Sequence, residues 1–270
     1  MPLLDVSGAT LEYTTTGSGP HIILVPGAPG SQSVFRFLVP LLARTRTVTT
    51  YSRRGLSGSQ LRGAQDYPRR LDADADDLAA LVRHVADGDA CVFGSSSGAI
   101  VALRFLERHP DLPLKTCVAH EPPSIMVLPA EVLPEREEMH RALYALYREK
   151  GAPHALETFA SFFDDEKDRA GMGLLMDPAA SADMRADVTY WLERECPYVF
   201  EKVDLEALGK AGDRLVLSVG ERSKDGVMGQ PTFALMERLG MREERLLVVP
   251  GGHISYITDA EELAEALSRL

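Results

Sequence analysis

Short apolar runs alternate with amphipathic segments along most of the chain, and this alternation constrains the fold more than any other feature. The runs are rich in β-branched residues and end at or just before Gly, Ser, Pro or Glu, as strands buried on both faces do. A regular βα succession predicts an α/β protein with a mostly parallel, eight-stranded sheet flanked by helices. The runs lie at 21–26, 47–51, 90–94, 115–120, 214–219 and 245–249, and the clearest helical patterns at 71–87, 98–108 and 258–269.

Two segments depart from this alternation. The first 16 residues indicate an antiparallel pair of strands that turns at Ser7-Gly8. Residues 124–212 contain long helical stretches and many acidic residues but no convincing strand. We expect them to form a helical lid, inserted in an α/β core made of residues 1–123 and 213–270.

Composition excludes several classes of partner. The formal charge of -11 argues against nucleic acid, because neutralising phosphates needs clustered Lys and Arg. The N-terminus lacks the basic start and apolar run of a signal peptide, and no window approaches the ~20 apolar residues of a membrane span. We therefore expect a soluble cytoplasmic protein with a small-molecule substrate and no membrane partner, either a monomer or a homodimer.

The cysteines and the acidic runs do not have the spacing of a metal site. Cys91, Cys117 and Cys196 are an odd number, and two of them lie in strand-like runs where a free Cys behaves as a small hydrophobe. The Asp-rich stretch 72–77 precedes the apolar face of a helix, whose N-terminal end favours carboxylates. No metal or organic cofactor is expected.

The segment Gly94-Ser95-Ser96-Ser97-Gly98 is the strongest candidate for chemistry. Its glycines bracket Ser96 in a G-x-S-x-G pattern, in which the Ser occupies a tight turn between a strand and a helix. A strand-like run precedes the pattern and a helical run follows it, which is the context that the motif requires. We therefore predict that Ser96 is a nucleophile.

A Ser hydroxyl is a poor nucleophile until a base removes its proton, so a His must lie near Ser96 in space. Among the seven His, His253 is the best candidate because it follows Pro250-Gly251-Gly252 in the loop after the last predicted strand. That loop is expected at the same edge of the sheet as Ser96. His120 also lies near this edge, where we interpret it as a neighbour of the base.

Four segments together resemble the α/β-hydrolase superfamily over nearly the full length of the chain. They are 25–30, 51–59, 93–98 and 250–253, each following a predicted strand, with Ser96 before His253 as in that fold. The resemblance implies a serine hydrolase whose oxyanion hole is formed by the backbone N–H groups of Ala28 and Ser97. The chain departs from the family where Pro26 replaces a frequent His and Ser52 a frequent Asp, and neither change removes a group needed for acyl transfer.

The acid that would orient His253 is less clear. Many family members have an Asp after the seventh strand, at the position where this chain has Ser223. Asp225 and Glu221 lie close to that position and stay open as alternatives. We favour Glu121, at the end of the run 115–120, because the two prolines after it are expected to hold it on a stiff, extended backbone.

The leading hypothesis is acyl transfer to water through an acyl-enzyme on Ser96, with His253 as the base and Glu121 as its orienting acid. The substrate would be an ester, lactone or thioester of small or medium size. The alternatives are a lyase, perhydrolase or carbon–carbon hydrolase on the same fold, or a non-catalytic ligand-binding protein. Apolar lid residues are candidates for lining the substrate pocket: Phe162, Phe163, Met172 and Trp191.

Overall fold

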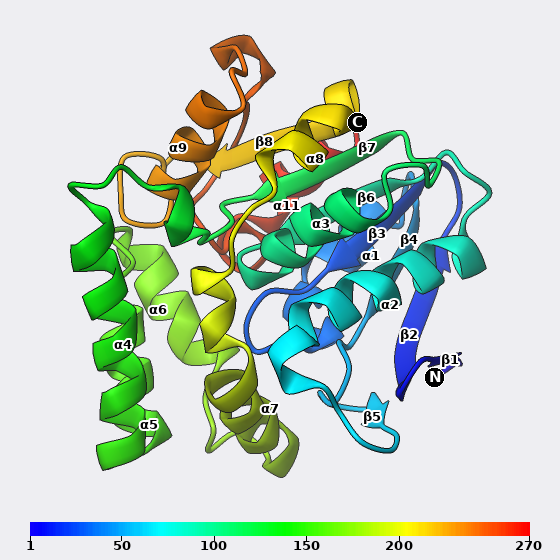
Figure 1. The fold of residues 1–270 in the computed structure, drawn as a ribbon. Coiled ribbons are helices and arrows are strands. Elements are labelled where there is room, and N and C mark those ends of the chain that lie inside the picture. The colour runs from blue at the N-terminus through cyan, green and yellow to red at the C-terminus, as the bar shows by residue number, and fades with distance from the viewer.

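The computed structural model describes residues 1–270 and is built around one nine-stranded sheet (Figure 1). Six neighbouring strands run parallel in the order β4-β3-β6-β7-β8-β9. Antiparallel β2 and β1 extend the sheet beside β4, and the short β5 pairs with β2. The predicted α/β fold with a mostly parallel sheet is therefore confirmed. The strands are β1 (Leu3–Val6), β2 (Ala9–Gly17), β3 (His21–Val25), β4 (Thr47–Tyr51), β5 (Gln60–Leu61), β6 (Cys91–Ser95), β7 (Thr116–His120), β8 (Leu215–Gly220) and β9 (Leu247–Val249).

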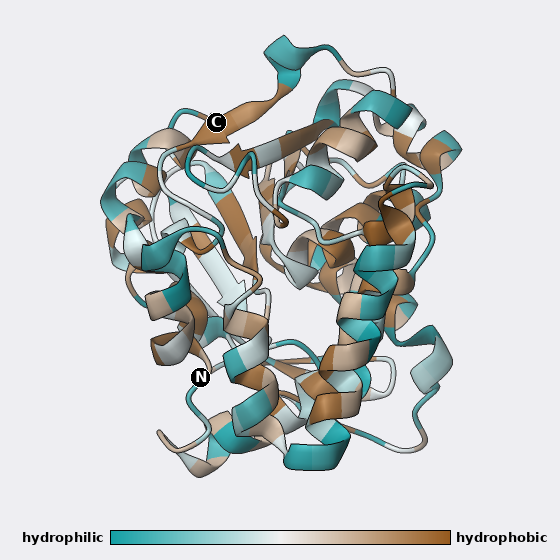
Figure 2. Ribbon diagram, turned by 90° about the vertical axis from the view of Figure 1, so that its left-hand side faces the viewer, coloured by the Kyte–Doolittle hydropathy of each residue, from teal (hydrophilic) through white to brown (hydrophobic).

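The strands in the middle of the sheet are buried on both faces, which explains their continuous apolar runs. All five residues of β6 are buried, and in β3, β4 and β7 only the first residue is partly exposed. The helices are amphipathic instead, so hydrophobic and hydrophilic colours alternate along them in Figure 2. Their apolar sides cover the sheet.

Helices cover both faces of the sheet and divide the core into two clusters. On one face α2 packs on α3, with α8 beside α3 and α9 against β8. On the other face α1 packs against α11. These helices are α1 (Leu38–Leu42), α2 (Arg70–Val85), α3 (Ser97–Arg108), α8 (Leu205–Ala211), α9 (Gln230–Arg238), α10 (Ser255–Thr258) and α11 (Ala260–Leu267).

Four further helices lie between β7 and β8 in the sequence and gather beyond the carboxyl ends of the parallel strands (Figure 1). We call them the helical insertion: α4 (Leu133–Lys150), α5 (Ala152–Ala160), α6 (Glu166–Leu175) and α7 (Ala182–Arg194). Their apolar residues join the core cluster of α1 and α11. The predicted lid, 124–212, also took in α8, which packs on α3 in the layer that covers the sheet.

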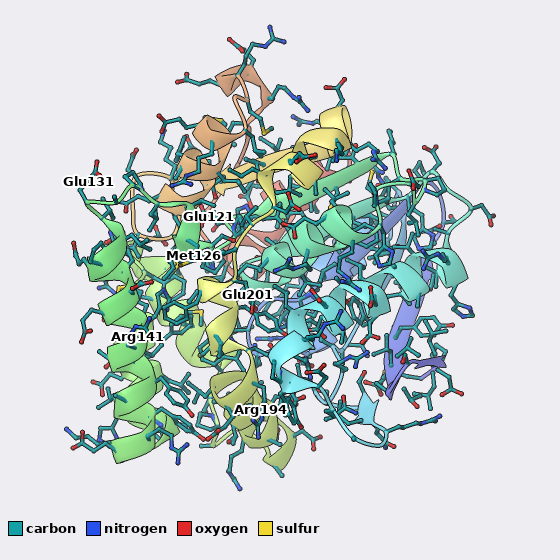
Figure 3. The ribbon with its side chains drawn as sticks, viewed as in Figure 1. Glu121, Met126, Glu131, Arg141, Arg194 and Glu201 are labelled. Carbon is teal, nitrogen blue, oxygen red and sulfur yellow. The ribbon has the colours of Figure 1, made fainter.

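The helical insertion is fastened to the core by polar contacts. Asp187 of α7 accepts hydrogen bonds from the backbone N–H of Ser57 at 2.6 Å and from its hydroxyl at 2.5 Å. The guanidinium of Arg194, labelled in Figure 3, lies 4.2 Å from the centroid of the Tyr67 ring. Both contacts join α7 to the segment between β4 and α2.

Two predicted elements end differently from expectation. The helix expected over 258–269 forms as α11, two residues shorter at each end, and a separate short helix, α10, ends at Thr258 just before it. The last strand begins at Leu247, because Glu243–Arg245 form a turn of 3-10 helix.

None of the helices has the length and apolar composition needed to cross a bilayer.

Candidate active site

Ser96 lies at the sharp turn between β6 and α3. Its backbone has φ +56° and ψ −126°, a conformation that L-residues rarely adopt and that is found at functional sites. A Cβ on Gly98 would lie 2.3 Å from the carbonyl oxygen of Val25, so glycine lets α3 approach the end of β3. The Ser96 N–H donates to the His120 carbonyl at 3.0 Å, which fixes the turn to the end of β7. The motif thus forms a strand–turn–helix, which we call the elbow, and it places Ser96 in the wall of a cavity.

Two backbone N–H groups beside Ser96 have no partner within the chain. The N–H of Ser97 opens α3, where an acceptor one turn earlier in the helix is lacking. The N–H of Ala28, in the loop after β3, makes no backbone hydrogen bond. Ala28, Ser96 and Ser97 line the same cavity. The site therefore presents two donors beside the hydroxyl, one of them at a helix N-terminus where the macrodipole favours negative charge.

His253 follows β9 and is paired with Glu121. Its Nδ1 lies 2.7 Å from Oε2 of Glu121, and both side chains are almost completely buried. An ionised carboxylate can only accept, so Nδ1 carries the proton and Nε2 is left as the basic nitrogen of the ring. No hydrogen bond joins Nε2 of His253 to the hydroxyl of Ser96.

The second oxygen of Glu121 is held by two donors. Oε1 accepts the Gly220 N–H at 2.8 Å and the Ser223 hydroxyl at 2.5 Å. Burial raises the pKa of the Glu121 carboxyl, but its hydrogen bonds with His253 and Ser223 and the two nearby imidazoles outweigh burial and leave the pKa below its usual value. Glu121 is therefore ionised and oriented at neutral pH.

The backbone at Glu121 corrects one expectation. Its φ is +45°, so the residue is in the left-handed region and not on the extended backbone predicted from the following prolines. The chain turns sharply after β7, and the Glu121 N–H bonds the Ser218 carbonyl of β8 at 2.9 Å. This turn directs the carboxylate across β8 toward the loop that carries His253.

The alternative acids lie elsewhere. Glu221 and Asp225 are both exposed, and neither side chain makes a hydrogen bond or an ion pair with His253. Ser223, at the position where relatives often have the acid, donates its hydroxyl to Glu121. The loop after β8 thus contributes a supporting hydroxyl, while the carboxylate comes from the end of β7.

His120 packs beside the pair without joining it. It is fully buried, its Nδ1 lies 3.1 Å from the hydroxyl of Ser218, and its ring stacks with Phe93 at 5.8 Å and with His253 at 6.3 Å between centroids. Burial lowers the pKa of His120, which keeps its imidazole neutral. It supports the ring of His253 by packing.

A second carboxylate, Asp168 of α6, holds the backbone of the His253 loop. Its Oδ2 accepts the His253 N–H at 2.6 Å, and its Oδ1 accepts the Ile254 N–H at 3.4 Å. A Cβ on Gly252 would lie 2.1 Å from this carboxylate, so the glycine makes room for it. Burial raises the pKa of Asp168, against the opposing effect of His253. The helical insertion therefore fixes the loop that carries the imidazole.

A buried cluster of charges lies on the other side of the elbow. Arg53 donates to Glu195 at 2.5 Å and to the Ser97 hydroxyl at 3.3 Å, and Arg70 donates to the second oxygen of Glu195 at 3.0 Å. Asp74 lies 3.4 Å from both guanidiniums. Glu195 directly follows α7, so this cluster ties the helical insertion to the residue after Ser96. Removing one member of such a buried network leaves the charges of its partners buried without a counter-ion.

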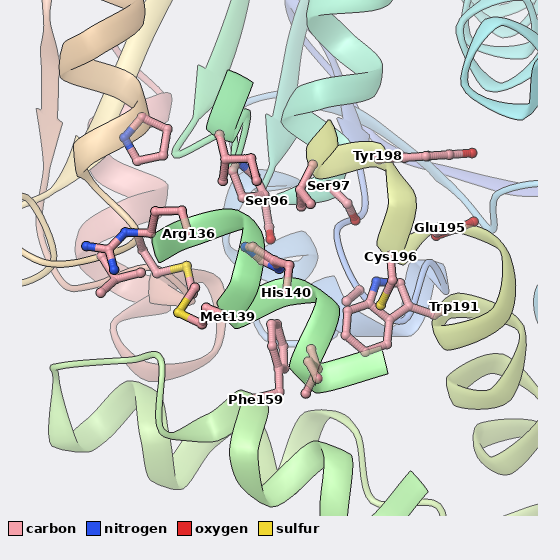
Figure 4. A pocket seen from close by; sticks show the side chains of 18 residues that line it. Ser96, Ser97, Arg136, Met139, His140, Phe159, Trp191, Glu195, Cys196 and Tyr198 are labelled. Carbon is pink, nitrogen blue, oxygen red and sulfur yellow. The ribbon is translucent and has the colours of Figure 1, made fainter. Parts of the chain in front are cut away.

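A narrow cavity of about 40 Å³ lies against Ser96 (Figure 4). Of the four predicted pocket residues only Trp191 lines it. Phe162, Phe163 and Met172 are buried in the core cluster, where the ring of Phe163 lies 5.3 Å from that of His253, because this apolar surface packs inward. The lining residues are Ala28, Ser96, Ser97, Pro123, Ile125, Arg136, Met139, His140, Leu143, Phe159, Trp191, Glu195, Cys196, Tyr198, Val199, Val227, Met228 and Pro231.

The fold and the elbow agree with a known family. Residues 22–266 match the family model described as "Alpha/beta hydrolase family". The chain belongs to this family. Membership identifies the protein as a hydrolase of the α/β fold, and no group of three or more His, Cys, Asp or Glu is arranged to hold a metal ion.

Several α/β hydrolases are similar to this one along most of its length. The uncharacterized hydrolase YraK of Bacillus subtilis is 29% identical over 269 residues, which cover 98% of this chain and 93% of the relative. The esterase EaEST of Exiguobacterium antarcticum has a TM-score of 0.76 at 18% identity, covering 98% of this chain and 96% of that structure. The enol-lactonase of Burkholderia xenovorans has a TM-score of 0.71 at 17% identity, covering 99% and 98%. The two structures share the fold.

Proposed function

We propose that this α/β hydrolase is a serine hydrolase that cleaves an ester, lactone or thioester of small or medium size through an acyl-enzyme on Ser96. The observation that carries the proposal is the Glu121–His253 pair at 2.7 Å, which leaves Nε2 of His253 as the free basic nitrogen at the edge of the sheet that also holds Ser96. Catalytic hydrogen bonds in substrate-free enzymes are often open and close in the Michaelis complex.

In the first half of the reaction Ser96 Oγ attacks the substrate carbonyl while His253 Nε2 takes the hydroxyl proton. The carbonyl oxygen becomes an oxyanion and accepts the N–H groups of Ala28 and Ser97. Glu121 stabilises the imidazolium without taking its proton. When the tetrahedral intermediate collapses, His253 gives the proton to the leaving alcohol or thiol, and the acyl group stays on Ser96.

In the second half a water attacks the acyl carbonyl and His253 takes one of its protons. Collapse of the second intermediate returns a proton from His253 to Ser96 Oγ and releases the carboxylic acid. A lactone would release one hydroxy acid, since its leaving alcohol stays attached to the acyl group. All proton transfers use Nε2 of His253, so the reaction needs no co-reactant other than water.

The surroundings favour acyl transfer over non-catalytic binding. The cavity beside Ser96 is lined mostly by hydrophobic side chains, and the helical insertion acts as a lid over it. A strained Ser, a buried Glu–His pair and two unpaired N–H groups would be costly to keep in a protein that only binds a ligand.

The experiment is a panel of p-nitrophenyl esters of increasing acyl length, assayed beside lactones and thioesters. The proposal expects turnover of at least one class, with a loss of about 1,000-fold or more in kcat for Ser96→Ala. Ser95→Ala is the matched control, because Ser95 is buried in β6 and does not line the cavity. Equal turnover by wild type and Ser96→Ala, or inactivity across the whole panel, would refute the proposal.

A further inference from the structure

The polar groups in the wall of the cavity divide into those that are already bonded and those that are not. Glu195 is held by two arginines, the Ser97 hydroxyl by Arg53, and the Tyr198 hydroxyl donates to Asp74 at 2.7 Å. Each of these groups already makes its hydrogen bonds within the protein and is not available to a ligand. Apart from Ser96, the two N–H groups beside it and the weakly donating thiol of Cys196, this leaves the polar side chains on α4.

One face of α4 lines the cavity. Arg136, Met139, His140 and Leu143 are spaced three and four residues apart, so they share that face, and all four belong to the lining. Figure 4 shows His140 beside Ser96 in that view, with Arg136 one turn nearer the start of the helix. Two polar side chains therefore belong to the cavity wall on this helix face, with His140 toward Ser96 and the guanidinium of Arg136 farther from Ser96 in the view of Figure 4.

His140 is neutral and has no hydrogen-bond partner. Its ring contacts the rings of Phe162 and Phe200 edge-on at 5.8 and 6.2 Å between centroids, and no polar group of the chain bonds it. Burial, with a contribution from the charge of Arg136, lowers the pKa of His140 to about 4. At neutral pH it offers a ligand one N–H donor.

Arg136 is a cation whose donors are only partly used. One Nη donates to the neutral Gln230 at 2.9 Å, and the nearest carboxylate, Glu135, lies 3.6 Å away on a side chain that is 78% exposed. Its Nε is buried without a partner. Because Glu195 is neutralised by its own two arginines, Arg136 is the one charged group in the lining without a buried counter-ion. An anion in the cavity would supply that counter-ion.

The direction of the reaction decides which part of a substrate meets these residues. The leaving group must reach His253 to receive its proton, and His253 is not among the residues that line the cavity. The cavity, with Ser96 at one side and α4 in its wall, therefore holds the acyl part.

We propose that the substrate's acyl part carries a carboxylate that Arg136 binds, with His140 donating a hydrogen bond to an oxygen of the same acyl part. The substrate class is then an ester, lactone or thioester of a dicarboxylic acid. This inference rests on the proposed function, because it assigns the acyl group of that reaction. It makes Arg136 a specificity-determining residue contributed by the helical insertion.

The test compares two p-nitrophenyl esters of equal chain length, the monoester of hexanedioic acid and the hexanoate, each corrected for spontaneous hydrolysis. The expected kcat/KM is at least about tenfold higher for the hexanedioate in wild type, and Arg136→Gln removes most of that preference. The ratio of the two values does not depend on how much of a variant is folded. Arg141→Gln is the control, since Arg141 is 62% exposed on the same helix and does not line the cavity, and it should keep the preference.

Equal kcat/KM values for the two esters in wild type, or a preference that survives Arg136→Gln, would overturn the inference while leaving the serine-hydrolase mechanism in place. Binding gives a readout that does not need turnover. Trp191 is the only tryptophan and lines the cavity, so its fluorescence can follow binding to a Ser96→Ala variant. Monomethyl hexanedioate should bind at least about tenfold more tightly than methyl hexanoate, and Arg136→Gln should equalise the two. If the Ser96→Ala variant with Arg136 intact bound the two esters equally tightly, the result would contradict carboxylate binding by Arg136.

Discussion

Glu121 and His253 are joined by a 2.7 Å hydrogen bond although they are 132 positions apart in the sequence. The same carboxylate is anchored by the Gly220 N–H and the Ser223 hydroxyl, so it is fixed on both oxygens. The end of β7 and the loops after β8 and β9 meet at this one group. In the proposed mechanism it selects the ring tautomer that leaves Nε2 basic.

Glu121→Gln should lower kcat on any ester substrate by about 1,000-fold or more, because an amide can no longer stabilise the imidazolium and can favour the wrong tautomer. Steady-state kinetics on a p-nitrophenyl ester measure this loss. Asp225→Asn and Glu221→Gln are the controls and should stay close to wild type, since both side chains are exposed and do not contact His253. A silent Glu121→Gln together with a dead Asp225→Asn would assign the acid to the loop after β8.

Asp168 should behave as a positioning residue for His253. Asp168→Ala removes the acceptor of the His253 N–H and should lower kcat by about 10- to 100-fold with little change in KM, because Asp168 does not line the cavity. Asp168→Asn keeps an oxygen acceptor and should recover part of the rate.

Asp165→Ala is the matched control for Asp168. It removes the N-cap of the same helix, whose carboxylate accepts the Asp168 N–H at 2.9 Å, and an ion pair with Arg222 at 2.7 Å, while neither oxygen of Asp165 bonds His253 or Ile254. It should lower stability by about 1 kcal/mol and leave kcat near wild type. If Asp168 acted only by stabilising the fold, Asp168→Ala and Asp165→Ala would lose kcat in proportion to the stability that each variant loses. That result would contradict a positioning role for Asp168.

The buried His140 should make stability depend on pH. Its folded pKa of about 4 lies below the usual 6.5, so the unfolded chain binds a proton first. The stability that the protein gains from keeping His140 unprotonated is fully present above pH 6.5 and is lost as the pH falls from 6.5 toward 4. Between pH 7.5 and 4.5 the free energy of unfolding should fall by about 2 kcal/mol more in wild type than in His140→Gln, measured by urea denaturation. If the free energy of unfolding fell equally with pH in wild type and His140→Gln, the result would contradict a lowered pKa of His140 in the folded protein.

Close packing at the elbow predicts a large effect of one added methyl group. Gly98→Ala would place a Cβ 2.3 Å from the Val25 carbonyl oxygen and should destabilise the protein by about 3 kcal/mol or more. Gly173→Ala is the control, because a Cβ there meets nothing within 4 Å and Ala favours the helix α6. Thermal unfolding should show a fall in Tm for the first variant and an unchanged or higher Tm for the second.

Local patterns were sufficient to predict the elbow and eight of the nine strands, because each of those strands carries its own periodicity, whereas the two-residue β5 is too short to show one. The apolar runs around Ser96 fixed a strand, a turn and a helix, and their order placed His253 at the same edge of the sheet. The ion pair between Asp259 and Arg222 is a contact between residues 37 positions apart, which no local pattern reveals.

The supporting groups were harder to predict, since they come from segments distant in sequence. Asp168 belongs to no motif, and only the folded chain brings α6 to the His253 loop. Asp74 did carry a signal, because it shares the apolar face of α2 with Leu71 and Leu78 and is buried with them. An acidic residue on an apolar helix face indicates a buried partner, here Arg53. Phe162, Phe163 and Met172 do not line the cavity, because the apolar character of a lid residue does not distinguish a cavity wall from a core.

The central claim is that Ser96 is the nucleophile, and covalent labelling by a fluorophosphonate probe tests it most directly. Intact mass should show one adduct per wild-type chain, and peptide mapping should place it on Ser96. The adduct should be absent from Ser96→Ala, strongly slowed in His253→Ala, and retained in Ser95→Ala. No adduct on the wild-type protein, or labelling that persists in Ser96→Ala, would contradict the account.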